Sequence, residues 1–277
     1  MSGIRHIGVI EPMTQNDSLN GRVALITGGG GEIGGAIARR FAGAGAAVAV
    51  ADLRREAADQ VAQDIKAAGG RALAITADVS IADDARQSVA EAVAAFGKLT
   101  TLVNVAASVT PDGTVETLTL EDWNDTLAVN LTGAFLMCKF AVPEIRKAGG
   151  GAIINIASQL GQIAPAGRAP YSTSKAALIQ FTKCLAVDHA KDGIRANSLS
   201  PGGVDTARIL LRFESREAAN RARGPSYLLG RPGRVDEIAA GALFLACDNS
   251  SFMTGADLLI DGGYLAFKGT IESDRPR

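Results

Sequence analysis

The chain has few residues of the types that bind transition metals or form disulfide frameworks. Its 277 residues include only two histidines, His6 and His189, and neither has a cysteine or a second histidine at ligand spacing. We therefore expect no metal site. The cysteines Cys138, Cys184 and Cys247 are odd in number, far apart and set in apolar helical stretches. This arrangement favours buried free thiols in a reducing compartment, so we expect a cytoplasmic protein.

A large excess of charge of either sign is also missing. The 28 basic and 29 acidic residues give a net charge of -1, so nothing favours nucleic acid or an anionic membrane surface as a partner. No apolar run reaches the roughly 18 residues that a membrane helix needs. Hydrophobic residues make up 47% and charged residues 21%, which is typical of a soluble globular protein.

Short apolar runs alternate with helical patterns along most of the chain. The expected strands cover residues 23–27, 47–52, 72–76, 101–104, 152–157, 194–200 and 257–260, and the expected helices cover 35–44, 55–67, 82–96, 120–147, 171–191, 207–224 and 235–247. This alternation predicts one α/β domain, a doubly wound parallel sheet with helices on both faces. Its core spans about residues 20–265, preceded by an N-terminal extension (1–18) and followed by a polar tail (269–277).

The first expected strand ends in a glycine-rich turn. Gly28–Gly31 follow the strand directly, Gly34 precedes the next expected helix, and the second strand ends at Asp52, 18 residues beyond Gly34. Glycines between a strand and a helix let the backbone approach a ligand, and the helix N-terminus attracts a diphosphate. A tight turn alone would also use glycines, but the full context predicts a dinucleotide site.

Asp52 favours one cofactor over the other. A carboxylate at the end of the second strand accepts hydrogen bonds from the adenosine ribose hydroxyls and repels a 2′-phosphate. NAD is therefore preferred to NADP. Arg54 and Arg55 leave an alternative open, because an arginine just after the strand could turn toward a phosphate, although both also suit the solvated start of the next helix.

Tyr171 and Lys175 stand four residues apart in the helix expected over 171–191. Residues at this spacing share one helix face. An ammonium held beside a phenol stabilises the phenolate, so the pair is a candidate general acid and base. The same spacing also occurs by chance on exposed helix faces, so the pair needs support from the rest of the chain.

Two further polar positions suggest a site. Asn130 and Gly133 interrupt the helix expected over 120–147, where both residue types are unfavourable, so they indicate a kink or a functional position. Ser158 ends the fifth strand and stands thirteen residues before Tyr171. Taken alone, Asn130 could satisfy a helix bend and Ser158 could cap a turn.

The ordered set of motifs closely resembles the short-chain dehydrogenase/reductase family over roughly residues 20–265. The motifs are Thr27-Gly28, Gly34, Asp52, Asn104, Asn130, Ser158, Tyr171, Lys175 and Pro201-Gly202. The resemblance implies a Rossmann fold and hydride transfer between nicotinamide and a secondary alcohol or ketone. It makes Tyr171 the proton donor and acceptor, Lys175 its partner and the holder of the nicotinamide ribose, Ser158 the residue that orients the substrate oxygen, and Asn130 the anchor of a water in the proton relay.

The resemblance also implies the cofactor contacts. They are Gly28, Gly31, Ile33, Gly34, Asp52, Asp78, Val79, Asn104, Ala106, Tyr171, Lys175, Pro201, Gly202, Val204 and Thr206. Three positions depart from the family pattern. Glu32 replaces a glycine and either sits favourably at the helix N-terminus or points at the diphosphate and weakens binding. Val105 and Ala107 replace an asparagine and a glycine, so the adenosine support is expected to differ.

The substrate pocket is predicted less sharply. If the family geometry holds, Gln159, Gln162, Arg168, Arg208 and the lid-like segment 207–227 border it, because loops at the strand carboxyl ends form the crevice. The arginines could hold a substrate carboxylate, as could Arg212, or could be solvated surface residues. We expect only a secondary alcohol or ketone as the substrate.

Other functions and the assembly state stay open at this point. An NADP-dependent 3-oxoacyl-type reductase and a non-catalytic dinucleotide-sensing protein are alternatives on the same fold. The resemblance implies a homotetramer or homodimer assembled through the apolar faces of the helices 120–147 and 171–191, although the same stripes also suit core packing.

Overall fold

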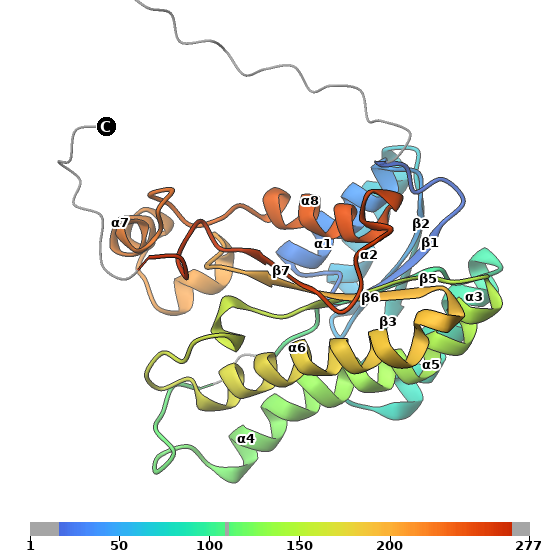
Figure 1. The fold of residues 1–277 in the computed structure, drawn as a ribbon. Coiled ribbons are helices and arrows are strands. Elements are labelled where there is room, and N and C mark those ends of the chain that lie inside the picture. Colours follow the sequence, from blue (N-terminus) through green and yellow to red (C-terminus); the bar gives the residue numbers. More distant parts are fainter. Residues whose placement is uncertain (1–16, 109–110, 268–277) are drawn as a thin grey trace, which may run out of the picture.

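The computed structural model describes residues 17–108 and 111–267. The polar tail predicted at 269–277 lies outside the described residues, as does all but the end of the extension predicted at 1–18. The remainder forms a single α/β domain (Figure 1).

Seven parallel strands form one sheet in the order β3-β2-β1-β4-β5-β6-β7. The strands are β1 (Val23–Thr27), β2 (Ala47–Asp52), β3 (Arg71–Thr76), β4 (Thr101–Asn104), β5 (Gly151–Ile156), β6 (Ile194–Pro201) and β7 (Asp257–Ile260). The strand order reverses between β1 and β4, so the carboxyl ends of these two strands open a crevice where ligands bind in such sheets. The predicted doubly wound, Rossmann-type sheet is confirmed.

Helices cover both faces of the sheet (Figure 1). They are α1 (Glu32–Gly43), α2 (Arg55–Ala67), α3 (Ala82–Phe96), α4 (Leu120–Leu127), α5 (Ala134–Lys147), α6 (Ala169–His189), α7 (Arg216–Arg223) and α8 (Val235–Ala246). One apolar core lies under α1, α2 and α8, and the other lies under α3, α5 and α6. Every side chain of β1 and β2 is buried, as the continuous apolar runs predicted.

Three local expectations were wrong. Helix α1 begins at Glu32 rather than 35, since a carboxylate is favourable in the first turn of a helix. The segment 207–224 is not one helix but a 3₁₀ turn, Ala207–Leu211, followed by α7, whose N-terminus is capped by the Ser215 hydroxyl. Cys184 is exposed on α6, whereas Cys138 and Cys247 are buried.

A π-helical turn, Ala128–Gly133, joins α4 to α5 and confirms the irregularity predicted at Asn130. Gly133 lies against Val79, because a Cβ built on it would approach the Val79 Cγ2 to 2.7 Å. Length and composition alone would let the stretch Leu120–Lys147 cross a membrane. It packs instead on the sheet beside α3 and α6, as a core helix does (Figure 1).

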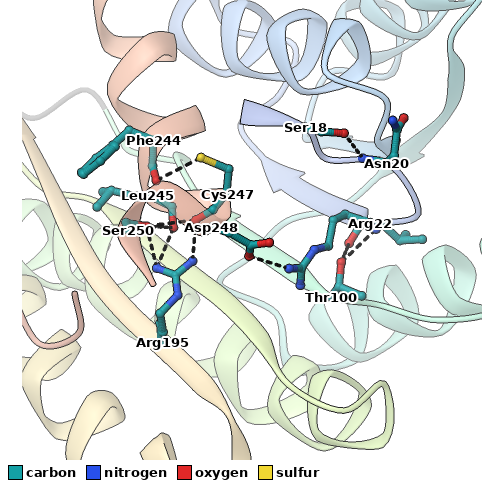
Figure 2. Close-up of polar contacts among 11 residues, drawn as sticks. Ser18, Asn20, Arg22, Thr100, Arg195, Phe244, Leu245, Cys247, Asp248 and Ser250 are labelled. Carbon is teal, nitrogen blue, oxygen red and sulfur yellow. Dashed lines mark hydrogen bonds and ion pairs between the residues drawn. The ribbon is translucent and has the colours of Figure 1, made fainter. Parts of the chain in front are cut away.

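Polar contacts tie together the edge of the sheet where the strands begin (Figure 2). Arg195 of β6 donates to the carbonyls of Leu245 and Cys247, at 2.9 and 3.1 Å, and thereby binds the C-terminus of α8. Arg22, just before β1, pairs with Asp248 at 3.0 Å. These bonds have a structural role at this edge, whereas sheets of this kind bind their ligands at the opposite, carboxyl edge.

Candidate active site

The glycine-rich loop after β1 forms a backbone cradle. Gly28 has a φ of 61°, and a Cβ on it would lie 2.8 Å from the Ala106 amide nitrogen. A Cβ on Gly34 would clash with the Gly28 carbonyl oxygen. In the described part of the chain no side chain caps the N-terminus of α1 at Gly31, so the first-turn N–H groups are available to a diphosphate. The loop therefore fits a dinucleotide, with Ile33 in the same first turn.

Asp52 lies directly beside this loop and is only 8% exposed. Its carboxylate accepts hydrogen bonds from the N–H groups of Gly30 and Arg54, both at 3.0 Å. These bonds hold the carboxylate at the carboxyl end of β2, where an adenosine ribose would lie. The Arg54 side chain is 69% exposed with Nε 3.6 Å from Asp52, and Arg55 pairs with Asp59 at 2.7 Å.

Two predicted cofactor residues have structural partners of their own. The Asp78 carboxylate accepts hydrogen bonds from the N–H and hydroxyl of Ser80, at 2.9 and 2.6 Å, and closes the turn after β3. Asn104 is 5% exposed and donates to the Asn155 side chain at 2.9 Å, which links β4 to β5. Asp78 thus fixes the turn after β3, and Asn104 fixes β4 against β5, at the border of the crevice.

Ser158 and Tyr171 line one cavity of about 560 Å³ at the carboxyl edge of the sheet. The Ser158 oxygen accepts a hydrogen bond from the Leu160 N–H at 3.1 Å and so caps a 3₁₀ turn. This bond uses an acceptor lone pair and leaves the hydroxyl hydrogen to donate. Capping the turn and polarising a substrate oxygen are therefore compatible roles.

Lys175 is buried beneath the cavity, with 2% of its surface exposed. Its Nζ donates to the Ile156 carbonyl at 2.8 Å and lies 5.8 Å from the centroid of the Tyr171 ring. Burial, and secondly the positive charge of Arg208, lower the pKa of Lys175 from 10.5 to about 7. The amine can therefore exchange protons near neutral pH.

Asn130 connects three segments around the cavity. Its side-chain oxygen accepts a hydrogen bond from the Ser108 N–H at 2.9 Å, and its amide donates to the Ser174 hydroxyl at 3.1 Å. The Ser174 hydroxyl donates in turn to the Tyr171 carbonyl at 2.7 Å. The π-helical turn thus holds the loop after β4 and the first turns of α6 in register.

The cavity lining contains only some of the predicted site residues. Gln159, Arg168, Arg208, Gly202, Val204 and Thr206 line it together with Tyr171 and Ser158. Gln162 does not: it is exposed and donates to Asp257 at 2.6 Å. Pro201 ends β6 outside the lining. Sequence reasoning missed Asp112, which no motif marks. It placed Arg223 and Tyr227 at the pocket only as part of the segment 207–227, without singling them out.

Comparisons with known proteins agree with this geometry. A family model described as enoyl-(acyl carrier protein) reductase matches residues 30–265. A 2,5-dichloro-2,5-cyclohexadiene-1,4-diol dehydrogenase of Sphingobium indicum is 43% identical, with 89% of this chain and 97% of that protein covered. The D-threitol dehydrogenase of Mycolicibacterium smegmatis is 40% identical, with 89% and 94% covered. A short-chain type dehydrogenase/reductase from Mycobacterium marinum superposes with a TM-score of 0.81 at 36% identity, covering 90% and 97%.

The chain belongs to the short-chain dehydrogenase/reductase family. Its relatives are alcohol and diol dehydrogenases, so this member of the family is an oxidoreductase that acts on CH–OH groups with NAD(P).

Two of the residues that depart from the family pattern, Glu32 and Val105, form specific contacts in this short-chain dehydrogenase/reductase. The Glu32 carboxylate accepts a hydrogen bond from the Ala207 N–H and pairs with Arg216 at 3.0 Å. It therefore engages the segment 207–227. The Val105 N–H donates to the Thr27 hydroxyl at 3.2 Å, so this stretch is held by its backbone whatever its side chains.

Proposed function

We propose that the protein is an NAD-dependent dehydrogenase and ketone reductase for secondary alcohols, with Tyr171 as the general acid and base. The observation that carries the proposal is the placement of the Tyr171 ring 5.8 Å from a buried amine, in the cavity that Ser158 also lines. This cavity opens beside a glycine loop suited to a dinucleotide, and the names of two relatives, a cyclic diol dehydrogenase and a threitol dehydrogenase, support alcohol chemistry.

In this proposal each side chain has one task in proton transfer or orientation. When bound, the nicotinamide supplies the hydride acceptor for the carbinol carbon. Tyr171 takes the hydroxyl proton during oxidation and returns it during reduction, while the Ser158 hydroxyl holds the same oxygen. Lys175 stabilises the phenolate and, with a pKa of about 7, passes protons on. Asn130 holds α6 and the neighbouring loop at the positions that this chemistry needs.

The experiment that tests the proposal is NADH formation with a panel of cyclic secondary alcohols, polyols and hydroxy acids. We expect turnover with at least one class, because the cavity and the buried amine are preformed. Silence across the panel, with NAD binding demonstrated by calorimetry, would contradict the enzymatic proposal. That outcome would favour the dinucleotide-sensing alternative.

Cofactor choice is tested separately at Asp52. We expect kcat/KM for NAD to exceed that for NADP by about tenfold or more, because a carboxylate a few ångströms from a 2′-phosphate repels it by one to several kcal/mol. Asp52→Asn removes this charge and should abolish most of the discrimination, whereas Asp83→Asn, an exposed carboxylate on α3 that pairs with Arg86, should leave it unchanged. A wild-type preference for NADP would instead support the 3-oxoacyl-type reductase, with Arg54 holding the phosphate.

The proposal also includes an assembly of identical subunits. Helices α4 to α6 expose large apolar side chains, among them Leu120, Phe135 and Val187 at 74, 47 and 81%, and Cys184 is exposed on the same α6. Exposed apolar patches of this kind favour association, so we include a homotetramer or homodimer formed through these helices. Sedimentation of a monomer at micromolar concentration would contradict it.

A further inference from the structure

The cavity carries more positive charge than the oxidation of a neutral alcohol requires. Arg168, Arg208, Arg212 and Arg223 line it, and Asp112 is the carboxylate in the same lining. The net charge of these five side chains is therefore +3. Among the described residues, neither Arg208 nor Arg223 forms an ion pair, since each donates instead to a neutral oxygen, of a backbone carbonyl or of a phenol.

Arg168 is the arginine best placed to meet a substrate. It precedes the first turn of α6, its side chain is 16% exposed, and its guanidinium carbon lies 5.1 Å from the centroid of the Tyr171 ring. Its Nη1 donates to Asp112 at 2.9 Å, but its buried Nε has no hydrogen-bond partner among the described residues. A buried, unpaired donor lowers stability, and an acceptor on a ligand would remove that penalty.

The Asp112 carboxylate pairs with two of these arginines. One oxygen of its carboxylate, Oδ1, accepts from both Arg168 and Arg212. The Asp112 side chain is 57% exposed and the Arg212 side chain 47%, so both ion pairs stand partly in water and each is individually weak. A carboxylate entering from the cavity would offer the same guanidinium groups an equivalent acceptor in a better desolvated position.

We propose that the substrate is a hydroxy acid, whose carboxylate is bound by Arg168 and Arg212 while its hydroxyl meets Tyr171 and Ser158. This inference rests on the proposed function and names the substrate class of the same site. The contact of Arg168 with the Tyr171 ring sets the carboxylate within a few bonds of the reacting carbon. In an acyl-carrier substrate, by contrast, the phosphates are far from the reacting carbon, so arginines at this position would not bind them.

Matched substrates test the proposal. Initial rates of NADH formation are compared for 3-hydroxycyclohexanecarboxylate and 3-hydroxybutanoate, each against its methyl ester. We expect the acids to have kcat/KM values about 10–100-fold higher, mainly through KM, as charge-assisted hydrogen bonds give. Equal or better use of the esters would overturn the inference while supporting the dehydrogenase. No turnover with any neutral or acidic alcohol would contradict the proposed function itself.

Variants then assign the effect to the two arginines. Arg168→Gln and Arg212→Gln should each reduce the acid-to-ester ratio of kcat/KM by about tenfold or more, with the loss confined to the acids. Arg221→Gln is the matched control, because Arg221 lies on α7 outside the cavity lining. An unchanged ratio in both cavity variants would show that these arginines do not read the carboxylate.

A binding measurement keeps the inference testable without turnover. Cyclohexanecarboxylate is titrated into the protein with NAD present, and cyclohexylmethanol serves as its neutral counterpart. We expect the acid alone to bind, binding to be lost in Arg168→Gln, and Asp112→Asn to bind more tightly because the competing carboxylate is gone. Weaker binding in Asp112→Asn would mean that Asp112 orders the arginines instead of competing for them, and would overturn this account.

Discussion

The floor and the roof of the substrate cavity are built in different ways. The floor consists of Asn130, Ser158 and Lys175 beneath Tyr171, and these three residues are 1, 7 and 2% exposed. Their hydrogen bonds run to backbone groups or to other buried polar side chains. The roof is the segment 207–227, in which long arginine side chains form partly exposed ion pairs.

This difference separates chemistry from recognition. A buried donor or acceptor that loses its partner is left unsatisfied, so each bond in the floor fixes one geometry. An exposed ion pair contributes little and can exchange partners when a ligand arrives. The floor is therefore suited to one proton-transfer reaction, whereas the roof can adapt to the charge and shape of the substrate.

The largest expected effect breaks the floor. Tyr171→Phe removes the hydroxyl that exchanges the proton and keeps the ring that Arg168 covers. We expect kcat to fall by about 10²–10⁴-fold, the range of general acid–base catalysis, with NAD affinity changed little. Steady-state rates and calorimetric NAD binding check the two parts, and a variant that retains more than a tenth of the activity would falsify the assigned role.

The sheet, the glycine-rich turn and much of the floor could be predicted from the sequence. Strand boundaries, the glycine turn, Asp52 and the Tyr171–Lys175 pair follow from local rules of periodicity, turn chemistry and helical spacing. These features depend on neighbours in sequence or on the carboxyl edge of a parallel sheet. The irregularity at Asn130 was visible for the same reason, because asparagine and glycine are unfavourable inside a helix.

The roof could not be predicted because its contacts join residues far apart in sequence. Arg212 meets Asp112 across 100 positions, and Arg216 meets Glu32 across 184. Gln162 was expected in the pocket, but its side chain reaches Asp257, 95 positions away. Long flexible side chains can reach many partners, so composition indicates an arginine-rich lid without showing which carboxylate each arginine contacts.

A smaller effect on KM is expected where the roof contacts the first turn of α1, next to the glycine-rich loop. Arg216 donates to Glu32 at 3.0 Å and to Asp205 at 3.1 Å, and so links α7 to the first turn of α1. Arg216→Gln should raise KM for NAD and for the alcohol together by about two- to fivefold, since exposed pairs are weak, and leave kcat nearly unchanged. Arg234→Gln, which alters an exposed pair at the start of α8, is the control. A loss in kcat alone would indicate that the link acts on the floor instead.

The smallest expected effect tests whether the roof acts electrostatically on the floor. The charge of Arg208 is the second cause, after burial, of the low pKa of Lys175, about 7. A nearby positive charge disfavours the protonated amine, so Arg208→Gln should raise this pKa, by less than about one unit because burial remains. The ionisation near pH 7 in the profile of kcat/KM for NAD, which reports the free enzyme, should move to higher pH, whereas Arg86→Gln on α3 should not move it. A shift to lower pH would show that loss of the Arg208 hydrogen bond to the Ala107 carbonyl, and not loss of charge, controls the amine.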